Sequence, residues 1–502
     1  MLELGYITHS IDVIFQWQNV ILMAVGVSLG IVVGALPGLT ATMAVAVMLP
    51  FTFKMPADSG MLFLLGIYAG GIYGGSISAI LVGVPGTPAS AATVLDGYPL
   101  ARQGKAYEAL FMALWASVIG GVISGSILLI VAPAIAAFAL RFGPPEIFAL
   151  AVFGLTACVA GVASKNLVKG LMVAALGLIV STIGLDPLEA LPRFIFGIDA
   201  LTGGIPLVPV LIGLFAISEI LQQVQQELHI SVETVKRSRF DLKLLLNHAK
   251  TLIKSSLIGT GIGAIPGTGA ASASFLSYTE ARRSSKHPER FGRGELDGVA
   301  ASESGNNAVC GGALIPLMTL GIPGDSVTAV LLGALMIQGL TPGPLLFERH
   351  GEYVYVVMIG FLVVNIIMLI LGRYFIRGFS LAVAVPRYYL LPAIGVFSIV
   401  GAYAVNNSLF DVLLMLIFGV IGYILPTLGF SVTPLLLALI LGPMAEASLR
   451  RSLILSGGSW AILVQRPITL AFLLLSVIVA LFTWLQSRKL PKEISDDARE
   501  EI

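Results

Sequence analysis

The sequence predicts an all-α, polytopic membrane protein with about 12 transmembrane helices plus broken or re-entrant helices, arranged as two internal, inverted repeats. Three observations carry this prediction. Only 11% of the 502 residues are charged, against about 25% in soluble domains, and the mean hydropathy is +0.94. Long stretches of the chain contain no charged residue, and similar Pro-Gly blocks recur in the same order in both halves of the chain.

Five long stretches contain no Asp, Glu, Lys or Arg: residues 13–53, 59–95, 109–140, 255–279 and 412–445. About 20 apolar residues cross a bilayer core, so several of these stretches are long enough to cross once and some twice. They are continuous and rich in Leu, Ala and Gly, which favours helices over alternating barrel strands. This composition excludes a soluble enzyme, a nucleic-acid-binding protein and a secreted disulfide scaffold.

The apolar segments fall on both sides of a basic segment at residues 223–254. We expect a first membrane repeat over 1–222, a cytoplasmic linker over 223–254, a second membrane repeat over 255–487 and a charged cytoplasmic tail over 488–502. The apolar segments lie near residues 14–36, 60–83, 109–138, 147–164, 167–185, 204–222, 255–279, 304–323, 326–346, 353–372, 388–410, 412–428, 431–445 and 467–486.

The repeat is visible in two pairs of short blocks. GALPGLTAT at 34–42 matches GAIPGTGAA at 263–271, and LVGVPGT at 81–87 matches TLGIPGD at 319–325. Proline removes a helix donor and glycine loosens the chain, so each block predicts a helix break. A single break is an ordinary kink. Breaks at matching places in two repeats instead indicate discontinuous helices around a substrate site near the membrane midplane.

A helix that restarts after a break presents unpaired N–H groups and the positive end of its dipole, which suits an anion such as a carboxylate. We therefore expect the substrate or ion site at the four breaks and at the small and hydroxyl residues that follow them. These residues are Pro37, Gly38, Thr40, Thr42, Pro85, Gly86, Thr87, Pro266, Gly267, Thr268, Gly269, Pro323, Gly324 and Ser326.

Other polar residues in apolar segments are open to two interpretations. Ser76, Ser78, Asn306 and Asn307 could contact substrate or ion, or could make ordinary hydrogen bonds between helices. Asp325 is an intramembrane carboxylate that could hold a coupling cation such as Na⁺ or carry a proton. It could equally cap the helix that follows Pro323-Gly324, and the two roles are compatible.

The sequence gives little support to an enzyme. Ser76 follows two glycines, but the five histidines lie in or near loops, so no base is placed beside that serine. The chain contains no HExxH motif, no paired intramembrane aspartates and no nucleotide-binding loop. We expect no enzyme activity and no cofactor. A passive anion channel remains an alternative, because channels also use broken helices.

Four longer segments resemble the large membrane subunit of the tripartite tricarboxylate transporters, the TctA family. They are GALPGLTATMAVAVMLPF (34–51), YGGSISAILVGVPGTPASAATVLDGYPLARQGKA (73–106), HPERFGRGELDGVAASESGNNAV (287–309) and GGALIPLMTLGIPGDSVTAVLLGALMIQGLTPGP (311–344). The resemblance implies a secondary transporter of the bacterial inner membrane that takes up citrate-like carboxylates by Na⁺ or H⁺ symport. It also implies two protein partners, a small four-span TctB-like membrane subunit and a periplasmic TctC-like solute-binding protein.

The loop charges predict the orientation of the repeats. Residues 280–297 hold five Lys or Arg, whereas the matching loop 52–60 holds one; residues 96–108 hold two, whereas the matching loop 340–352 holds one. The positive-inside rule then makes 96–108, 223–254, 280–297 and the tail cytoplasmic. Equivalent loops would face opposite sides, so we expect the repeats to be inverted.

Overall fold

The computed structural model describes residues 4–162, 167–224, 243–382 and 387–489. It is 81% helical, which confirms the expected all-α class. Most of the basic segment 223–254 and nearly all of the tail 488–502 lie outside the described residues. The described chain divides into two compact units, each built from both halves of the sequence: unit 1 is Met1–Arg141 with Pro206–Ile424, and unit 2 is Phe142–Ile205 with Leu425–Ile502.

Unit 1 begins with a short helix that the sequence analysis missed, α1 (Leu4–Ile14). It continues with α2 (Trp17–Ala35), α3 (Ala41–Met48), η1 (Leu49–Thr52), α4 (Ala57–Leu81), η2 (Pro88–Ser90), α5 (Ala91–Leu100), the π-helical turn η3 (Ala101–Lys105) and α6 (Ala106–Ala139). The later part comprises α9 (Leu207–Ile212), the π-helical turn η5 (Gly213–Ile217), α10 (Ser218–Gln223), α11 (Lys243–Asn247), α12 (Ala249–Gly263), α13 (Gly269–Ser284), η6 (Pro288–Arg290), α14 (Leu296–Leu320), α15 (Ser326–Ile337), α16 (Pro344–Arg349), α17 (Gly351–Ala382), α18 (Arg387–Asn406) and α19 (Leu409–Thr427), which reaches into unit 2.

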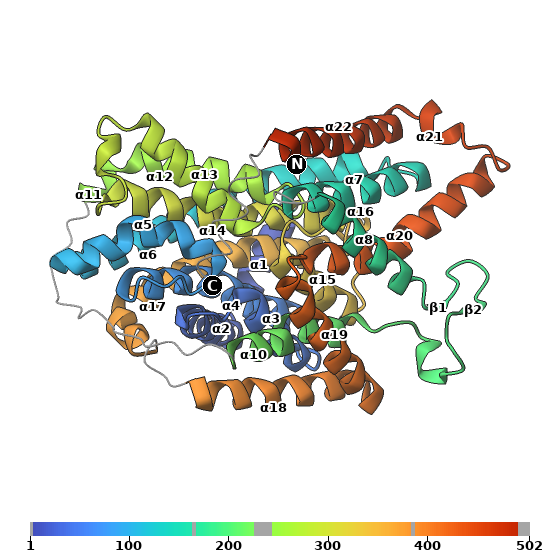
Figure 1. The fold of residues 1–502 in the computed structure, drawn as a ribbon, viewed down its shortest axis with the longest axis horizontal. Helices are drawn as coiled ribbons and strands as arrows, with labels where there is room; N and C mark the ends of the chain where they lie inside the picture. Colours follow the sequence, from blue (N-terminus) through green and yellow to red (C-terminus); the bar gives the residue numbers. More distant parts are fainter. Residues whose placement is uncertain (1–3, 163–166, 225–242, 383–386, 490–502) are drawn as a thin grey trace. The chain divides into compact units, whose positions relative to one another are not determined.

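Unit 2 packs α7 (Pro144–Val162) and α8 (Leu167–Ser181) against α20 (Thr433–Leu455) and α22 (Pro467–Lys489). Figure 1 shows the red α22 lying along the teal α7. The remaining elements are β1 (Gly184–Leu185), β2 (Pro192–Arg193), η4 (Asp199–Leu201) and α21 (Ile462–Gln465). The two strands form a minimal antiparallel ladder in which Gly184 pairs with Arg193 and Leu185 with Pro192.

Eight of the described helical segments are long and apolar enough to cross a bilayer, so the chain is a multi-pass membrane protein. They are Trp17–Ala35, Ala57–Leu81, Pro88–Ala139, Pro144–Gly161, Gly351–Tyr374, Tyr388–Asn406, Leu409–Thr427 and Pro467–Leu485. Four shorter apolar helical segments accompany them: Ala41–Thr52, Leu167–Ser181, Leu207–Gln223 and Ser326–Ile337.

Two expected boundaries were wrong because helices continue through charged residues. Residues 96–108 are not a loop; α5 passes through η3 into α6, and the chain bends at Gly104, whose φ is 79°. The expected segment 431–445 continues as α20 to Leu455. Its added turns carry Glu446 and Arg450, which lie one helical turn apart and interact at 3.5 Å.

Unit 1 has two ends that can be recognised from its contacts. At the first, which we call the 290 end, Asp96 accepts hydrogen bonds from the backbone N–H groups of Gly292, Gly294 and Glu295 at 2.8–2.9 Å. At the second, which we call the 60 end, Ser59 donates to Asn19 at 2.6 Å. The predicted loops 96–108 and 280–297 therefore meet at the 290 end, although they are far apart in sequence.

The helices α12 and α13 form a re-entrant hairpin at the 290 end, side by side with α14 (Figure 1). Lys254 near the start of α12 pairs with Glu280 near the end of α13 at 2.6 Å, so the chain enters and leaves at the same end. The helices α2 and α3 make the matching hairpin at the 60 end. Asn19 contacts Ser59, and a Cβ added at Gly60 would lie 3.1 Å from Cβ of Thr52, which follows α3.

The long helices α6 and α17 run antiparallel. A Cβ added at Gly372 would meet the Leu114 side chain, one at Gly121 would meet Asn365, and one at Gly125 would meet Leu362. Residues later in α6 thus lie beside residues earlier in α17. The two helices start at opposite ends of unit 1.

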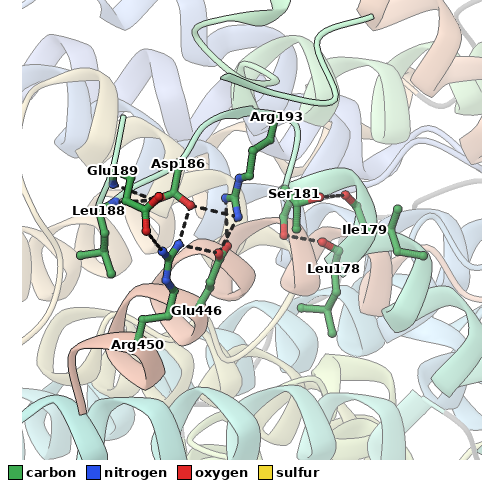
Figure 2. Close-up of polar contacts among 10 residues, drawn as sticks. Leu178, Ile179, Ser181, Asp186, Leu188, Glu189, Arg193, Glu446 and Arg450 are labelled. Carbon is green, nitrogen blue, oxygen red and sulfur yellow. Dashed lines mark hydrogen bonds and ion pairs between the residues drawn. The ribbon is translucent and has the colours of Figure 1, made fainter. Parts of the chain in front are cut away.

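In unit 2, the loop after α8 is held to α20 by an ionic network (Figure 2). Oδ1 of Asp186 accepts hydrogen bonds from the backbone of Leu188 and Glu189, both at 2.8 Å, while Oδ2 binds the Arg450 guanidinium. Arg193 forms a bidentate pair with Glu446, at 2.6 and 3.1 Å. The backbone N–H groups of Glu189 and Leu188, with Arg450, hold the pKa of Asp186 well below its usual value. Asp186 therefore contributes fully to the stability of the fold at pH values above the pKa of an ordinary carboxyl group. This contribution is lost as the pH falls through the lowered pKa of Asp186.

We expect Asp186→Asn to open this loop at neutral pH. The amide oxygen can still accept the two backbone hydrogen bonds, but the negative charge that holds Arg450 and lies 3.4 Å from Arg193 is gone. Trypsin should then cleave after Arg193 faster than in the parent protein. Glu189→Gln is the matched control, because Glu189 is 61% exposed and its pairing with Arg450 contributes little. Equal cleavage rates in all three proteins would contradict the assignment.

Candidate functional site

The first break separates α2 from α3 and forms the tip of their hairpin. Gly38 follows Pro37 with φ of 89°, a conformation in which a side chain would be strained. Thr40 then caps α3, because its hydroxyl accepts a hydrogen bond from the backbone N–H of Met43 at 3.1 Å. The side chain of Thr42, in the first turn of α3, is 6% exposed.

The third break, at the tip of the hairpin of α12 and α13, repeats this geometry in part. Gly267 follows Pro266 with φ of 80°, and Gly269 begins α13 with φ of 71°. Thr268 occupies the cap position but does not cap α13. Its hydroxyl donates back to the carbonyls of Ile262 and Ile265, at 2.7 and 2.9 Å, and so closes the end of α12.

The second break follows α4, whose residues 60–81 are buried. The chain turns back along its own helix, so that the N–H of Gly86, after Pro85, donates to the carbonyl of Gly75 at 3.3 Å. A Cβ added at Gly86 would lie 2.1 Å from the carbonyl oxygen of Gly34, so no larger residue fits. Thr87 stands at the start of η2, and its hydroxyl shares a hydrogen bond with that of Ser90 at 3.2 Å.

The fourth break follows α14 in the same manner. Gly324, after Pro323, packs so closely that an added Cβ would lie 2.4 Å from the carbonyl oxygen of Gly263. Asp325 caps α15 with a full capping box: its Oδ1 accepts from the backbone N–H of Thr328 at 2.8 Å, and the Thr328 hydroxyl lies 2.9 Å from the N–H of Asp325. Its other oxygen accepts from the Tyr68 hydroxyl at 2.6 Å.

The four breaks, residues 36–40, 82–87, 264–268 and 321–325, meet inside unit 1, and we call them the break cluster. The N–H of Gly267 donates to the carbonyl of Gly324 at 2.8 Å, which joins the third break to the fourth. The hydroxyls of Thr42 and Ser326 lie 2.8 Å apart and join the helix starts after the first and fourth breaks. The contact of Gly86 with Gly34 joins the second break to the first, and η2 packs on α13 beyond the third.

This arrangement points the N-termini of α3, α13 and α15, and of η2 leading into α5, toward one region. Each N-terminus offers backbone N–H groups and a partial positive charge, and the hydroxyls of Thr42 and Ser326 add neutral donors. Such a region suits a negatively charged carboxylate without any Arg or Lys among the residues of the breaks.

Some of the remaining residues predicted to bind substrate or ion already use their side chains in hydrogen bonds within their own helix. The hydroxyls of Ser76 and Ser78 donate to carbonyls of their own helix, those of Tyr73 and Gly75, at 2.7 and 3.3 Å. Asn306 and Asn307 are buried in α14. Within the described chain, neither polar atom of the Asn306 side chain has a hydrogen-bond partner, and the side-chain oxygen of Asn307 also lacks one.

Glu303, one turn before Asn307, was not among the residues predicted from the sequence. Its side chain is fully buried and accepts hydrogen bonds from the hydroxyls of Thr93 and Ser117, the latter at 3.2 Å. In the sequence it marks the edge of an uncharged stretch, so it was taken as a boundary. The signal that could have found it is the apolar sequence on both sides, which continues the helix from Leu296 to Leu320.

The fold and the break cluster define a polytopic membrane protein with discontinuous helices, the construction typical of secondary transporters. The sequence matches the model of the tripartite tricarboxylate transporter TctA family over residues 20–437. The chain belongs to this family, a family of non-enzymatic transport proteins, which confirms the resemblance found in the sequence.

Two relatives from Agrobacterium vitis extend the match. One, described as an uncharacterized 52.8 kDa protein in the TAR-I ttuC' 3' region, is 37% identical over 476 residues, which cover 94% of this chain and 95% of the relative. The other, described as an uncharacterized protein in the TAR-II ttuC' 3' region, is 37% identical over 242 residues, which cover 48% of this chain and all of the relative. No solved structure matches the chain.

We expect Asp325→Ala and Asp325→Asn to differ in stability. Alanine removes the cap and leaves the buried Tyr68 hydroxyl without its acceptor, so the free energy of unfolding should fall by about 1–3 kcal/mol. Asparagine caps nearly as well as aspartate and should keep most of that stability. Denaturant unfolding of the purified protein in mixed micelles measures both; an alanine variant as stable as the asparagine variant would contradict the capping role.

Proposed function

We propose that this chain is the permease subunit of a binding-protein-dependent secondary transporter that takes up citrate-like tricarboxylates or other carboxylates by Na⁺ or H⁺ symport. We place it in the bacterial inner membrane, with the break cluster as the substrate site. Membership of the TctA family supports the class of transporter and substrate. The observation that carries the site is the meeting of four helix starts from both halves of the chain.

The family also supports a tripartite assembly. The proposed partners are a small four-span TctB-like membrane subunit and a periplasmic TctC-like solute-binding protein that captures the carboxylate and delivers it. In this arrangement the binding protein selects the substrate, and the break cluster accepts any carboxylate of suitable size that is delivered to it.

We further propose that the two halves are inverted repeats, with a midplane site where their breaks meet. The support is geometric. The helical segment 96–108 and the loop 280–297 meet at the 290 end. The segments equivalent to them by sequence, 340–352 and 52–60, lie near each other at the 60 end, where Glu352 is within electrostatic range of Asp58. A Cβ at Gly60 would lie 2.9 Å from the side chain of Gln338, two residues before the segment 340–352. The antiparallel course of α6 and α17 is also what inversion requires.

Uptake of radiolabelled di- and tricarboxylates tests the function. Proteoliposomes with the full assembly should accumulate substrate when an inward Na⁺ or H⁺ gradient is imposed. Accumulation should stop without the binding protein or without the gradient. Downhill flux that needs neither would contradict symport and favour the alternative of a passive anion channel.

Cysteine accessibility tests the inversion. In a background of Cys158→Ser and Cys310→Ala, the variants Lys54→Cys and Lys286→Cys place single exposed thiols in equivalent loops. We expect a membrane-impermeant maleimide to label them from opposite sides of the membrane, with Lys286→Cys reacting from the cytoplasm because its loop is strongly basic. Labelling of both from the same side would refute inversion.

A further inference from the structure

Glu303 is a buried acidic group that the break cluster does not use. It lies within the long helix α14, and its side chain is 0% exposed. The groups that hydrogen-bond to its carboxyl are two neutral hydroxyls, those of Thr93 and Ser117, and no charged group of the described chain acts on it. A carboxylate that is buried without a cationic partner is strongly destabilising, so an ionised Glu303 requires a counter-ion.

Residues with unpartnered buried oxygens lie near Glu303 in the helix or interact with it. The Asn307 amide donates to the Ser117 hydroxyl at 2.8 Å, and the same hydroxyl donates to Glu303 at 3.2 Å, so one hydroxyl links the amide to the carboxyl. The Asn307 side-chain oxygen is buried and has no partner in the described chain. The same holds for the Asn306 oxygen, one turn from Glu303, and for the Tyr73 hydroxyl, which is within electrostatic range of Glu303.

We propose that Glu303 binds a sodium ion, with the Asn307 side-chain oxygen and the hydroxyls of Thr93 and Ser117 as further ligands. Hard cations prefer oxygen ligands of this kind. One carboxylate supplies one negative charge, which neutralises a monovalent ion. A proton on Glu303 could form a hydrogen bond to one acceptor and would leave the other buried oxygens without a partner. A sodium ion, in contrast, can be coordinated by several of these oxygens at once.

The site differs from the one expected at Asp325. Asp325 accepts hydrogen bonds from the backbone of the helix that it caps and from Tyr68, whereas both oxygens of Glu303 accept from side-chain hydroxyls. The carboxyl of Glu303 is joined through Ser117 to an amide with a free oxygen. Thr93 lies at the start of α5 and Ser117 in α6, so the site links helices of the first half to α14 of the second. A sodium site at Glu303 stands on these contacts alone; its role as the coupling site rests on the proposed function.

Sodium binding can be measured without substrate or partner subunits. The full chain is purified in detergent, and its thermal unfolding is followed while sodium chloride replaces choline chloride at constant ionic strength. A ligand that binds the native state and not the unfolded state raises the unfolding temperature, and the rise grows with the logarithm of the ligand concentration above its Kd. We expect the unfolding temperature of the parent protein to rise with the logarithm of the sodium concentration, and that of Glu303→Gln not to rise. Glu348→Gln, which removes an exposed carboxylate from a short helix, is the control and should respond like the parent.

Two more variants keep the test decisive if Glu303→Gln folds poorly. Glu303→Asp keeps the charge on a shorter side chain and should need roughly tenfold or more sodium for the same rise. Asn307→Leu, which removes the unpartnered oxygen, should weaken sodium binding to a similar degree.

Three outcomes would overturn the proposal: no sodium response in the parent, an unchanged response in Glu303→Gln, or a response that follows pH and ignores sodium. A sodium response that is lost in Asp325→Asn but kept in Glu303→Gln would likewise contradict the proposal, because it would assign the sodium ion to Asp325. Failure of carboxylate uptake with intact sodium binding would instead count against the proposed function, and the two failures are distinguishable.

Discussion

The structure depends on the need of interrupted backbone to find partners inside an apolar protein. Each Pro-Gly break frees N–H and carbonyl groups that neither lipid nor an apolar core can satisfy. Freed backbone groups of this chain find partners inside the protein: Gly267 donates to the carbonyl of Gly324 in another break, and Gly86 donates to the carbonyl of Gly75 in α4. The hydroxyls of Thr42 and Ser326 add a contact between the helix starts after two breaks. Because the partners come from both halves of the sequence, the break cluster also holds the halves together.

This constraint explains which features could be predicted from the sequence. Pro-Gly pairs have strong local effects, so the positions of the breaks and the cap at Asp325 could be predicted from the residues themselves, whereas Thr40 was expected to bind substrate and its capping role was not predicted. Whether a break kinks a helix or reverses it depends on contacts far along the chain, such as Lys254 with Glu280. The sequence therefore predicts broken or re-entrant helices in general, whereas the structure shows which helices form the hairpins. Hydropathy likewise ended α20 too early, because its ionic partners lie in a loop distant in sequence.

The same need for hydrogen-bond partners explains why the two buried carboxyl groups, Asp325 and Glu303, have different surroundings. Asp325 follows a break, where unpaired backbone donors are available, and its oxygens are satisfied by the helix that it caps. Glu303 lies within an unbroken helix, whose backbone groups are already paired, so only side chains can satisfy it. An acid that follows Pro-Gly therefore predicts a helix cap, whereas a lone acid within a continuous apolar helix fits the ion site that we propose. Asp325 was predicted from its neighbouring Pro-Gly pair, and Glu303 has no such local signal.

The central claim is that helix starts from the two halves meet and line one substrate site. The direct measurement is disulfide cross-linking of the double variant Thr42→Cys/Ser326→Cys, with Cys158 and Cys310 replaced, since the native hydroxyls lie 2.8 Å apart. The account predicts rapid cross-linking under mild oxidation, loss of carboxylate uptake, and recovery of uptake on reduction. Absence of a cross-link, or a cross-linked protein with full uptake, would contradict it.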